Sequence, residues 1–246
     1  MEDMMQSVAL IGPGNFTYSA IRIDKLESTE YTLVHMVVDK SPSVFKFAKE
    51  LTDCQIEIIK SCQKSPRMDN LLLRNTQFNE NIEEINGFIP LSSVDVNSYP
   101  PVNPSGWATA LFDATDTAIQ SVDAYAKNLF DSDYKANSVI FVVTDGMDNK
   151  STRSAASIKQ RLEDVRKSEH LESIEIALVG VTNGDNRLKD YLQNLATEAG
   201  MNKFIDISDA NGKELAKLAG WISKSISSSS TSLGKGTKSS SMQHAF

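Results

Sequence analysis

Five side chains that carry oxygen donors stand in three short segments of the sequence, and together they could bind a hard divalent cation. The segments are VHMVVDKSPS, GWATALFDA and SVIFVVTDG. Their oxygen donors are Asp39, Ser41, Ser43, Thr109 and Asp145. Because this set contains carboxylates and hydroxyls but no histidine or cysteine, it suits Mg²⁺, with Mn²⁺ or Ca²⁺ as alternatives. The sequence therefore indicates a metal site.

Two of these donors end strongly apolar runs. TLVHMVVD at 32–39 and SVIFVVTD at 138–145 are nearly continuous apolar stretches rich in β-branched residues, which predicts strands buried on both faces. In an open parallel sheet, ligands gather beyond the carboxyl ends of the strands. If the two strands are neighbours, Asp39 and Asp145 face each other, and their repulsion calls for a cation or a proton between them.

The rest of the chain alternates strand and helix patterns. Further strands are expected at 71–78, 85–94, 174–181 and 203–208, of which 71–78 and 85–94 form an antiparallel pair. Helices are expected from Val44 to Pro66 and at 111–129, 154–169, 188–200 and 211–226. This order predicts an α/β fold with a doubly wound, mostly parallel central sheet flanked by helices.

The two ends of the chain stand outside this alternation. Within residues 1–31, VALIG and FTYSAIRI flank the turn signal Gly12-Pro13-Gly14, which predicts an added N-terminal β-hairpin on a sheet edge. Residues 32–226 form the main domain. Residues 227–246 are rich in serine, glycine and lysine and have few apolar side chains, so we expect a flexible tail.

The composition and the first residues of the chain indicate which kinds of partner and which cellular compartment to expect. The 246-residue chain has a formal net charge of −7, which argues against binding nucleic acid or an anionic membrane through bulk charge. No apolar run approaches the roughly 20 residues that span a bilayer. The first residues, MEDMMQSVAL, lack the basic-then-apolar pattern of a secretory signal. We expect a cytoplasmic protein; the sequence gives no sign of its oligomeric state.

The cysteines agree with a reducing compartment. Cys54 and Cys62 fall in one expected helix, where eight residues separate them by about 12 Å. That separation exceeds disulfide reach, so both should be free thiols. His35, His170 and His244 show no ligand spacing, which argues against a zinc site.

A structural interpretation competes with metal binding in each segment. Serine and aspartate at a strand-to-helix turn usually cap the helix, and Ser43 before Val44 would serve that purpose. Asp113 and Asp116 are expected to complement the dipole of their helix. Asp148 and Asn149 are expected to shape the turn before the helix that starts at Ser154.

Taken together, the segments resemble a known family. DKSPS fits the Asp-x-Ser-x-Ser signature of von Willebrand factor A (vWA) domains, also called integrin I-like domains. Thr109 with Leu111 and Asp113 fits the loop threonine before the family's L-x-D helix start, and Thr144-Asp145-Gly146 fits its TDG. The resemblance covers residues 32–226 and fills the family's metal-ion-dependent adhesion site (MIDAS): Asp39, Ser41, Ser43, Thr109 and Asp145.

The resemblance implies a fold and a function. It implies a Rossmann-like sheet with one antiparallel edge strand and a divalent cation, usually Mg²⁺, whose open coordination position accepts a Glu or Asp of a protein partner. The expected function is therefore a protein-binding module and not an enzyme. Lys40, Pro42 and GWAT depart from the family pattern, and Lys40 could oppose cation binding. An exposed Trp107 would favour partner contact, whereas packing on its own loop is the alternative.

Two other functions compete with this one. A Mg²⁺-dependent phosphohydrolase of the haloacid-dehalogenase type would use Asp39 as nucleophile and Asp145 or Asp148 as metal ligand. That chemistry requires a second carboxylate, the general acid, two positions after the nucleophile, where this chain has Ser41. The third candidate is a scaffold whose metal is purely structural.

Overall fold

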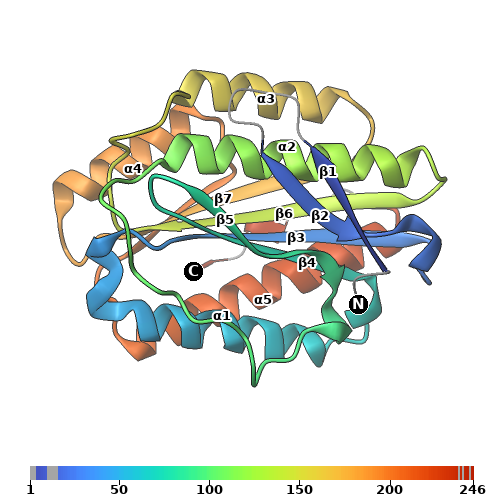
Figure 1. Cartoon of the computed structure of the whole chain (residues 1–246), viewed down its shortest axis with the longest axis horizontal. Helices are drawn as coiled ribbons and strands as arrows, with labels where there is room; N and C mark the ends of the chain where they lie inside the picture. Colours follow the sequence, from blue (N-terminus) through green and yellow to red (C-terminus); the bar gives the residue numbers. More distant parts are fainter. Residues whose placement is uncertain (1–3, 10–15, 238, 240, 244) are drawn as a thin grey trace.

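The computed structural model describes residues 4–9, 16–237, 239, 241–243 and 245–246. Within them, an eight-stranded sheet of order β1-β2-β5-β4-β3-β6-β7-β8 lies between two layers of helices (Figure 1). The strands are β1 (Met5–Ala9), β2 (Thr17–Ile21), β3 (Glu30–Asp39), β4 (Leu71–Phe78), β5 (Ile82–Pro90), β6 (Lys135–Thr144), β7 (Ile174–Val181) and β8 (Lys203–Ile207). The α-helices are α1 (Ala48–Gln63), α2 (Leu111–Phe130), α3 (Ala155–Lys167), α4 (Asn186–Glu198) and α5 (Gly212–Gly234).

The centre of the sheet is the parallel pair β3 and β6. Their register runs from Glu30 opposite Lys135 to Val38 opposite Val143, so the two strands end at the same edge. Nine of the ten residues in each strand are buried. Both faces are covered by helices, which explains why these segments read as continuous apolar runs.

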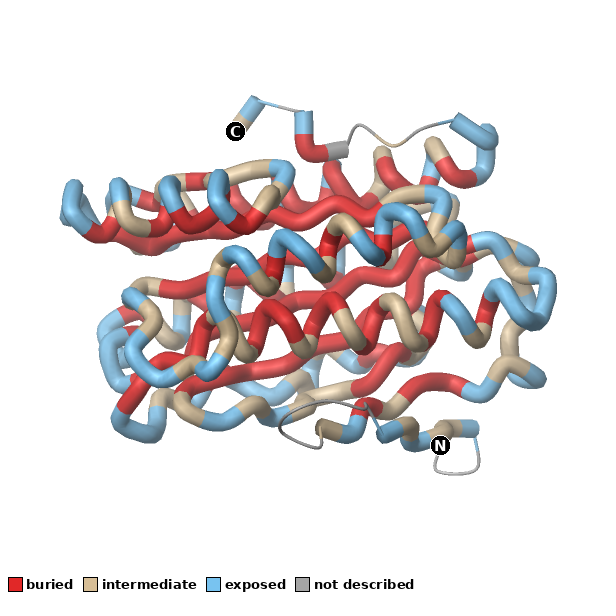
Figure 2. Tube along the Cα trace, turned by 90° about the horizontal axis from the view of Figure 1, so that it is seen from above, coloured by how far each residue is buried: buried red, intermediate tan, exposed pale blue. Residues whose placement is uncertain are grey.

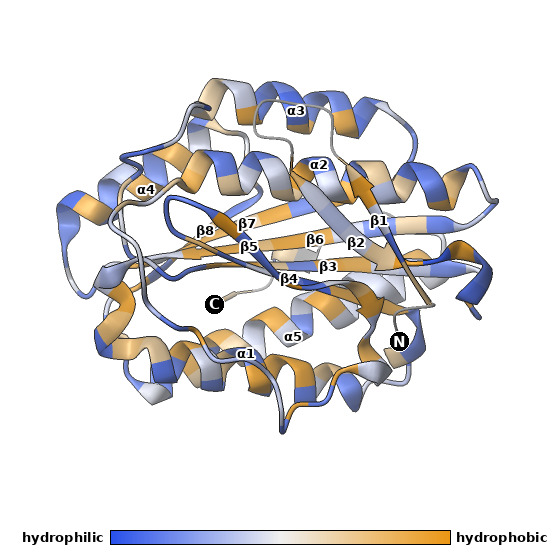
Figure 3. Ribbon diagram, in the orientation of Figure 1, coloured by the Kyte–Doolittle hydropathy of each residue, from blue (hydrophilic) through white to orange (hydrophobic). Residues whose placement is uncertain are grey.

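Helices cover the two faces of the sheet in different groups. Helices α2, α3 and α4 lie on one face, and α1 and α5 lie on the other (Figure 1). Each layer buries an apolar helix stripe against the strands, and the strands form a continuous buried layer between the helices (Figure 2). The hydropathy colouring shows the same division, with apolar central strands and polar outer helix faces (Figure 3). The predicted α/β fold class is confirmed.

The antiparallel part of the sheet also follows the expectation, with shifted bounds. β5 runs antiparallel to β4 and spans Ile82–Pro90, followed by a 3-10 turn at Leu91–Ser93, where a strand at 85–94 was expected. β1 and β2 form an antiparallel hairpin, and β2 lies parallel to β5 at Ala20 opposite Phe88. The turn signal Gly12-Pro13-Gly14 lies outside the described residues.

A buried ionic group holds the hairpin to the sheet. The Glu84 carboxylate accepts hydrogen bonds from the Ser19 backbone N–H at 3.0 Å and from the Ser19 hydroxyl at 2.5 Å. The same carboxylate pairs with Arg74, whose Nη2 lies 2.8 Å from Glu84 Oε2 and whose side chain is fully buried. Since β2 and β5 share little backbone pairing, this side-chain group supplies much of the polar attachment.

The flexible tail expected after residue 226 is wrong for its first part. α5 continues to Gly234, and Ser229, Ser230 and Leu233 are buried. The Ser229 carbonyl and hydroxyl both accept hydrogen bonds from Asn137 at 2.9 Å, and the Ser230 hydroxyl accepts one from Arg67 at 2.9 Å. Low apolar content misled the prediction because small serine side chains pack closely and satisfy their hydroxyls inside the protein.

The cysteine expectation is confirmed. Cys54 and Cys62 are both free and buried in α1. Among the described residues, no helix is long and apolar enough to cross a membrane.

Candidate metal site

Four of the five predicted donors are joined by hydrogen bonds at the edge where β3 and β6 end. The Ser43 hydroxyl donates to Asp145 Oδ1 at 2.7 Å, and the Ser41 and Ser43 hydroxyl oxygens lie 3.0 Å apart. The Ser41 backbone N–H donates to Asp39 Oδ1 at 2.7 Å. Residues 102 positions apart in the chain thus form one cluster of oxygen atoms.

The fifth donor, Thr109, lies beside the same turn. A β-carbon placed on Gly146 would stand 3.6 Å from the Thr109 hydroxyl, so this hydroxyl borders the residue that follows Asp145. Asn149 fixes the backbone of Thr109 in two ways: its side-chain oxygen accepts from the Thr109 N–H at 2.8 Å, and its own N–H donates to the Thr109 carbonyl at 3.1 Å. The fold therefore brings all five predicted donors to one edge of the sheet.

The donors do not act as helix caps, which was the competing interpretation. The 3-10 turn at Pro42–Phe47 has Ser41 at its N-cap position, and its side chain makes no capping hydrogen bond. Helix α1 begins after Phe47 and α2 begins after Ala110, again without a side-chain cap. The hydroxyl of Ser43 turns instead toward Asp145. The serine hydroxyls therefore serve the oxygen cluster rather than the helix ends.

The surroundings of both carboxyl groups disfavour their ionised form. Burial raises the pKa of Asp39 above its usual value, and hydrogen bonds from Thr144 and Ser41 oppose that effect. Burial raises the pKa of Asp145 to about 6; the Ser43 hydrogen bond opposes the rise and the nearby Asp39 adds to it. Within the described part of the chain, neither carboxylate forms an ion pair with Lys, Arg or His.

Lys40 does not supply the missing positive charge. Its ammonium group forms an ion pair with Glu83 on β5, and its side chain is largely buried. The Lys40 ammonium is therefore engaged by a carboxylate outside the oxygen cluster. This departure from the vWA pattern does not place a competing cation among the donors.

The donor set fits a hard divalent cation. The converging atoms are carboxylate and hydroxyl oxygens, and a bound cation would favour the ionised carboxylates, which burial disfavours at both aspartates. The described residues hold no group of three or more His, Cys, Asp or Glu side chains that could bind a metal, and the oxygen cluster itself combines two carboxylates with hydroxyls. Ser43 is exposed and Asp145 is half-buried, so the site opens to solvent on their side.

The supporting roles of Thr144 and Asn149 were not predicted from the sequence. The Thr144 hydroxyl donates to Asp39 Oδ2 at 2.6 Å and fixes the orientation of that carboxylate, while Asn149 holds Thr109 as described above. Thr144 was noticed only as part of the TDG motif. Nothing local in the sequence indicates these bonds, because each joins residues that are distant along the chain.

Asp148 and Asp113 each make a bond that was not predicted. Asp148 shapes the turn before α3 as expected, by accepting from the Ser151 N–H at 3.1 Å, and its carboxylate also accepts from the Phe112 N–H at 3.1 Å, in the first turn of α2. Asp113 accepts from the backbone N–H groups of Thr152 and Arg153 at 2.9–3.1 Å. These bonds hold the loop after β6 against the start of α2, so Asp148 has a structural role.

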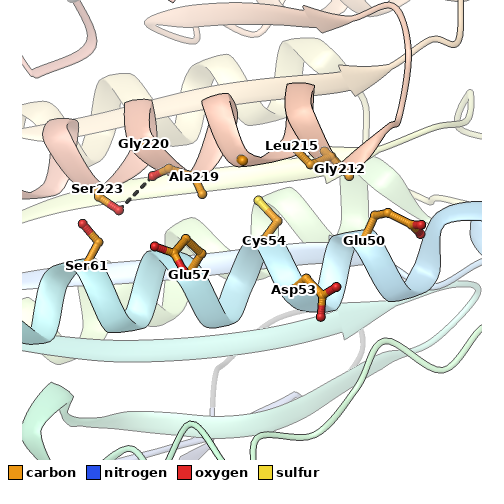
Figure 4. Close-up of a pocket in the computed structure, with 11 residues that line it drawn as sticks. Glu50, Asp53, Cys54, Glu57, Ser61, Gly212, Leu215, Ala219, Gly220 and Ser223 are labelled. Atoms are coloured by element: carbon orange, nitrogen blue, oxygen red, sulfur yellow. Dashed lines mark hydrogen bonds between the residues drawn. The ribbon is translucent and has the colours of Figure 1, made fainter.

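A separate groove of about 400 Å³ lies between α1 and α5 (Figure 4). Figure 4 shows Glu50, Asp53 and Glu57 of α1 along one side, with Cys54 between the two helices. Burial raises the pKa of the Cys54 thiol to about 12, so the thiol is protonated at neutral pH and is not a nucleophile. None of the five oxygen donors lines this groove.

Comparisons with known proteins show the fold. No protein-family model and no curated protein sequence matches the chain. Among solved structures, a D319A mutant of the PilB minor pilin from Streptococcus sanguinis matches with a TM-score of 0.59 and 17% identity over 92% of this chain. Proximal thread matrix protein 1 from the mussel byssus, in a structure whose MIDAS motif is occupied by zinc, matches with a TM-score of 0.51 and 18% identity over 80% of this chain.

BatB from Bacteroides thetaiotaomicron also matches, with a TM-score of 0.50 and 15% identity over 78% of this chain. The chain spans 98% of that protein, 68% of the pilin mutant and 46% of the thread matrix protein. At these identities the likeness establishes a vWA-like α/β fold and nothing finer. Metal binding by the thread matrix protein is a property of that protein.

Proposed function

We propose that this chain is a vWA-type protein-binding module whose MIDAS holds a divalent cation, Mg²⁺ by preference. The bound cation would engage a Glu or Asp of a protein partner. The proposed ligands are Asp39, Ser41, Ser43, Thr109 and Asp145. The observation that carries the proposal is the hydrogen-bonded series from Ser41 through Ser43 to Asp145, because these hydroxyls cap no helix.

The chemistry of the donors supports partner binding. Three neutral hydroxyls donate little charge, so a cation held there stays attractive to an incoming carboxylate. The exposed side of the cluster, at Ser43 and Asp145, leaves that carboxylate a path to the metal. Thr144 and the Ser41 N–H hold Asp39 in place by bonding both of its oxygens.

Isothermal titration of the chelator-treated protein with Mg²⁺, Mn²⁺ and Ca²⁺ tests the metal site. We expect saturable binding by the wild type and its loss in Asp39→Ala and Asp145→Ala. Asp131→Ala is a matched control, because Asp131 is exposed, follows the far end of α2 and forms its ion pair with Lys127, away from the oxygen cluster. Equal binding by Asp39→Ala and the control would refute the site.

The partner step needs a separate measurement. Once a candidate partner is purified, its affinity should fall when Mg²⁺ is replaced by chelator, and should fall equally in Asp39→Ala. A partner that binds with unchanged affinity in chelator would contradict the metal bridge even if the metal binds.

A phosphohydrolase is less consistent with this geometry. Asp39 is fully buried, and Ser41 stands two positions after it, where this chemistry needs a general-acid carboxylate. Asp148, the alternative metal ligand, accepts bonds from Phe112 and Ser151. Hydrolysis of a generic phosphate ester that is lost in Asp39→Asn would nevertheless establish that function.

A purely structural metal would give a different result. Chelation would then lower the unfolding temperature without changing the affinity for any protein. The cytoplasmic location stays a proposal that rests on the two unpaired cysteines, and the distribution of a tagged chain between cell fractions tests it.

A further inference from the structure

Three large apolar side chains on the segments that carry the oxygen donors are exposed. Phe45 is 78% exposed, Trp107 is 70% exposed and Met147 is 41% exposed. Only two other large hydrophobic residues of the described chain are similarly exposed, Met4 and Phe130. A single exposed apolar residue is ordinary, but several around one site mark an interaction surface.

Each of the three residues stands two positions from a proposed metal ligand. Phe45 follows Ser43, Trp107 precedes Thr109 and Met147 follows Asp145. Two residues of chain span at most about 7 Å between α-carbons. Because the three ligands meet at one edge of the sheet, the three apolar side chains border that edge on separate segments.

The backbone that carries Trp107 is fixed although its ring is exposed. The Trp107 N–H donates to Glu80 Oε2 at 3.0 Å, and the Ala110 N–H donates to the Asn79 carbonyl at 2.8 Å. Gly106 has φ +88°, where a β-carbon would also press on Asn79 and Glu80. The loop therefore holds the indole outward, against the alternative that it packs on its own loop.

The segment that carries Phe45 is anchored in a similar way. Its neighbours Val44 and Phe47 are buried in the core beside α1, with 0% and 5% exposure. Val44 and Phe47 point into the core, whereas Phe45 in the same short 3-10 turn points to solvent. Its exposure follows from the direction of the turn and does not reflect a loose segment.

A positive charge completes the surface. The Lys150 ammonium lies 4.9 Å from the centre of the Trp107 ring. This cation–π contact places a lysine at the edge of the cluster without an ion pair to either aspartate. A partner that brings a carboxylate to the site would therefore meet one cationic side chain and three apolar ones.

We propose that Phe45, Trp107 and Met147 form an apolar collar that selects a partner segment in which an acidic residue is flanked by large apolar side chains. The acidic residue would reach the oxygen cluster while its apolar neighbours bury against the collar. The inference rests on the proposed metal-bridged function and adds the partner's sequence chemistry to it.

Two short capped peptides test the collar, one with a central glutamate flanked by leucine and phenylalanine and one with the same glutamate flanked by serine. Their affinities for the full chain in Mg²⁺ are measured by fluorescence anisotropy. We expect the apolar-flanked peptide to bind about tenfold or more tightly, because apolar burial against the collar adds to the carboxylate contact. The variant Phe45→Ser/Trp107→Ser/Met147→Ser should lose this preference.

Controls separate the collar from the metal bridge. Phe130→Ser is the matched variant, because Phe130 is 50% exposed and lies at the opposite end of α2, about 30 Å from its start. It should keep the full preference, and the collar variant should keep the Mg²⁺ affinity of the wild type. Mg²⁺ titration also verifies that the collar variant is folded.

The outcomes are distinct. Equal binding of both peptides in Mg²⁺ overturns the collar and leaves the metal-bridged function standing, and so does a preference that survives in the collar variant. Failure of both peptides to bind also overturns the collar. A preference for apolar flanks that persists in chelator and in Asp39→Ala supports the collar and refutes the metal bridge.

Discussion

At the scale of residues, the buried carboxyl of Asp39 and the half-buried carboxyl of Asp145 make the metal-free protein sensitive to pH. The folded-state pKa of Asp145, about 6, lies above its ordinary 3.8, so ionisation of this group opposes folding. The penalty is present above about pH 6 and disappears as pH falls below about 4, where the carboxyl is protonated in both states.

Asp145→Asn should therefore stabilise the chelator-treated protein at pH 7.5 by about 1–2 kcal/mol, a figure reduced for the partial exposure of the group. The amide oxygen can still accept the Ser43 hydrogen bond. Urea unfolding at pH 7.5 and at pH 4 measures the effect, which should be much smaller at the lower pH. A destabilised variant at pH 7.5 would show that the carboxylate is already neutralised by the fold.

Lys40 gives a second prediction at this scale. Because its ammonium is paired with Glu83, Lys40→Ala should change the Mg²⁺ dissociation constant by less than about twofold. Titration calorimetry at low salt is the measurement. A marked increase in Mg²⁺ affinity would mean that the lysine turns toward the cluster in solution.

At the scale of elements, the end of α5 belongs to the folded structure. Leu233→Ala should lower the free energy of unfolding by about 2–4 kcal/mol, since the Leu233 side chain is buried on the helix. Lys224→Ala, an exposed change on the same helix, should cost less than about 0.5 kcal/mol. If both variants change the free energy of unfolding by the same small amount in chemical denaturation, the end of α5 is a flexible tail, as first expected.

The N-terminal hairpin depends on one carboxylate. Glu84→Gln leaves the fully buried Arg74 without its counter-charge and weakens the bonds to Ser19, so we expect a loss of about 3 kcal/mol. Hydrogen exchange should show the largest loss of protection in β2. Glu83→Gln, which alters only the pair with Lys40, is the adjacent control and should cost less than about 1 kcal/mol.

The accuracy of the element predictions follows from what each element packs against. β4 and β7 have the expected bounds, and every residue of both strands is buried; β7 is almost continuously apolar, whereas β4 is apolar at its two ends and polar between them. β5 starts earlier than predicted, since Glu83 and Glu84 look unlike strand residues until the buried Arg74 gives one of them a partner. The end of α5 was missed because serine packing depends on contacts with Asn137 and Arg67.

At the scale of the whole molecule, cation binding should add to folding stability. Mg²⁺ at about one hundred times its dissociation constant should raise the free energy of unfolding by about 2.7 kcal/mol if the unfolded chain does not bind it. Thermal unfolding with Mg²⁺ or chelator measures this shift, and Asp39→Ala should show none. If Mg²⁺ shifts the unfolding temperature of Asp39→Ala by the same amount, the cation binds at a site other than the oxygen cluster.

The five donors could be predicted because their residue types and their places at strand ends are visible in the sequence. Their geometry could not, because Thr144 reaches Asp39 across 105 residues and Asn149 reaches Thr109 across 40. The collar was visible only in part: Trp107 stood out beside its motif, whereas nothing local shows that Phe45 points outward and Phe47 inward.

The parallel register of β3 and β6 has a consequence for any fragment of this protein. A peptide that copies DKSPS carries Asp39 and both serines, yet it lacks Asp145 and the neighbouring strand that orients it. Cation affinity should accordingly appear and disappear with the native fold in a single cooperative step. Only correctly folded molecules would then bind the cation. A partner that requires the cation would not bind damaged or partly folded copies.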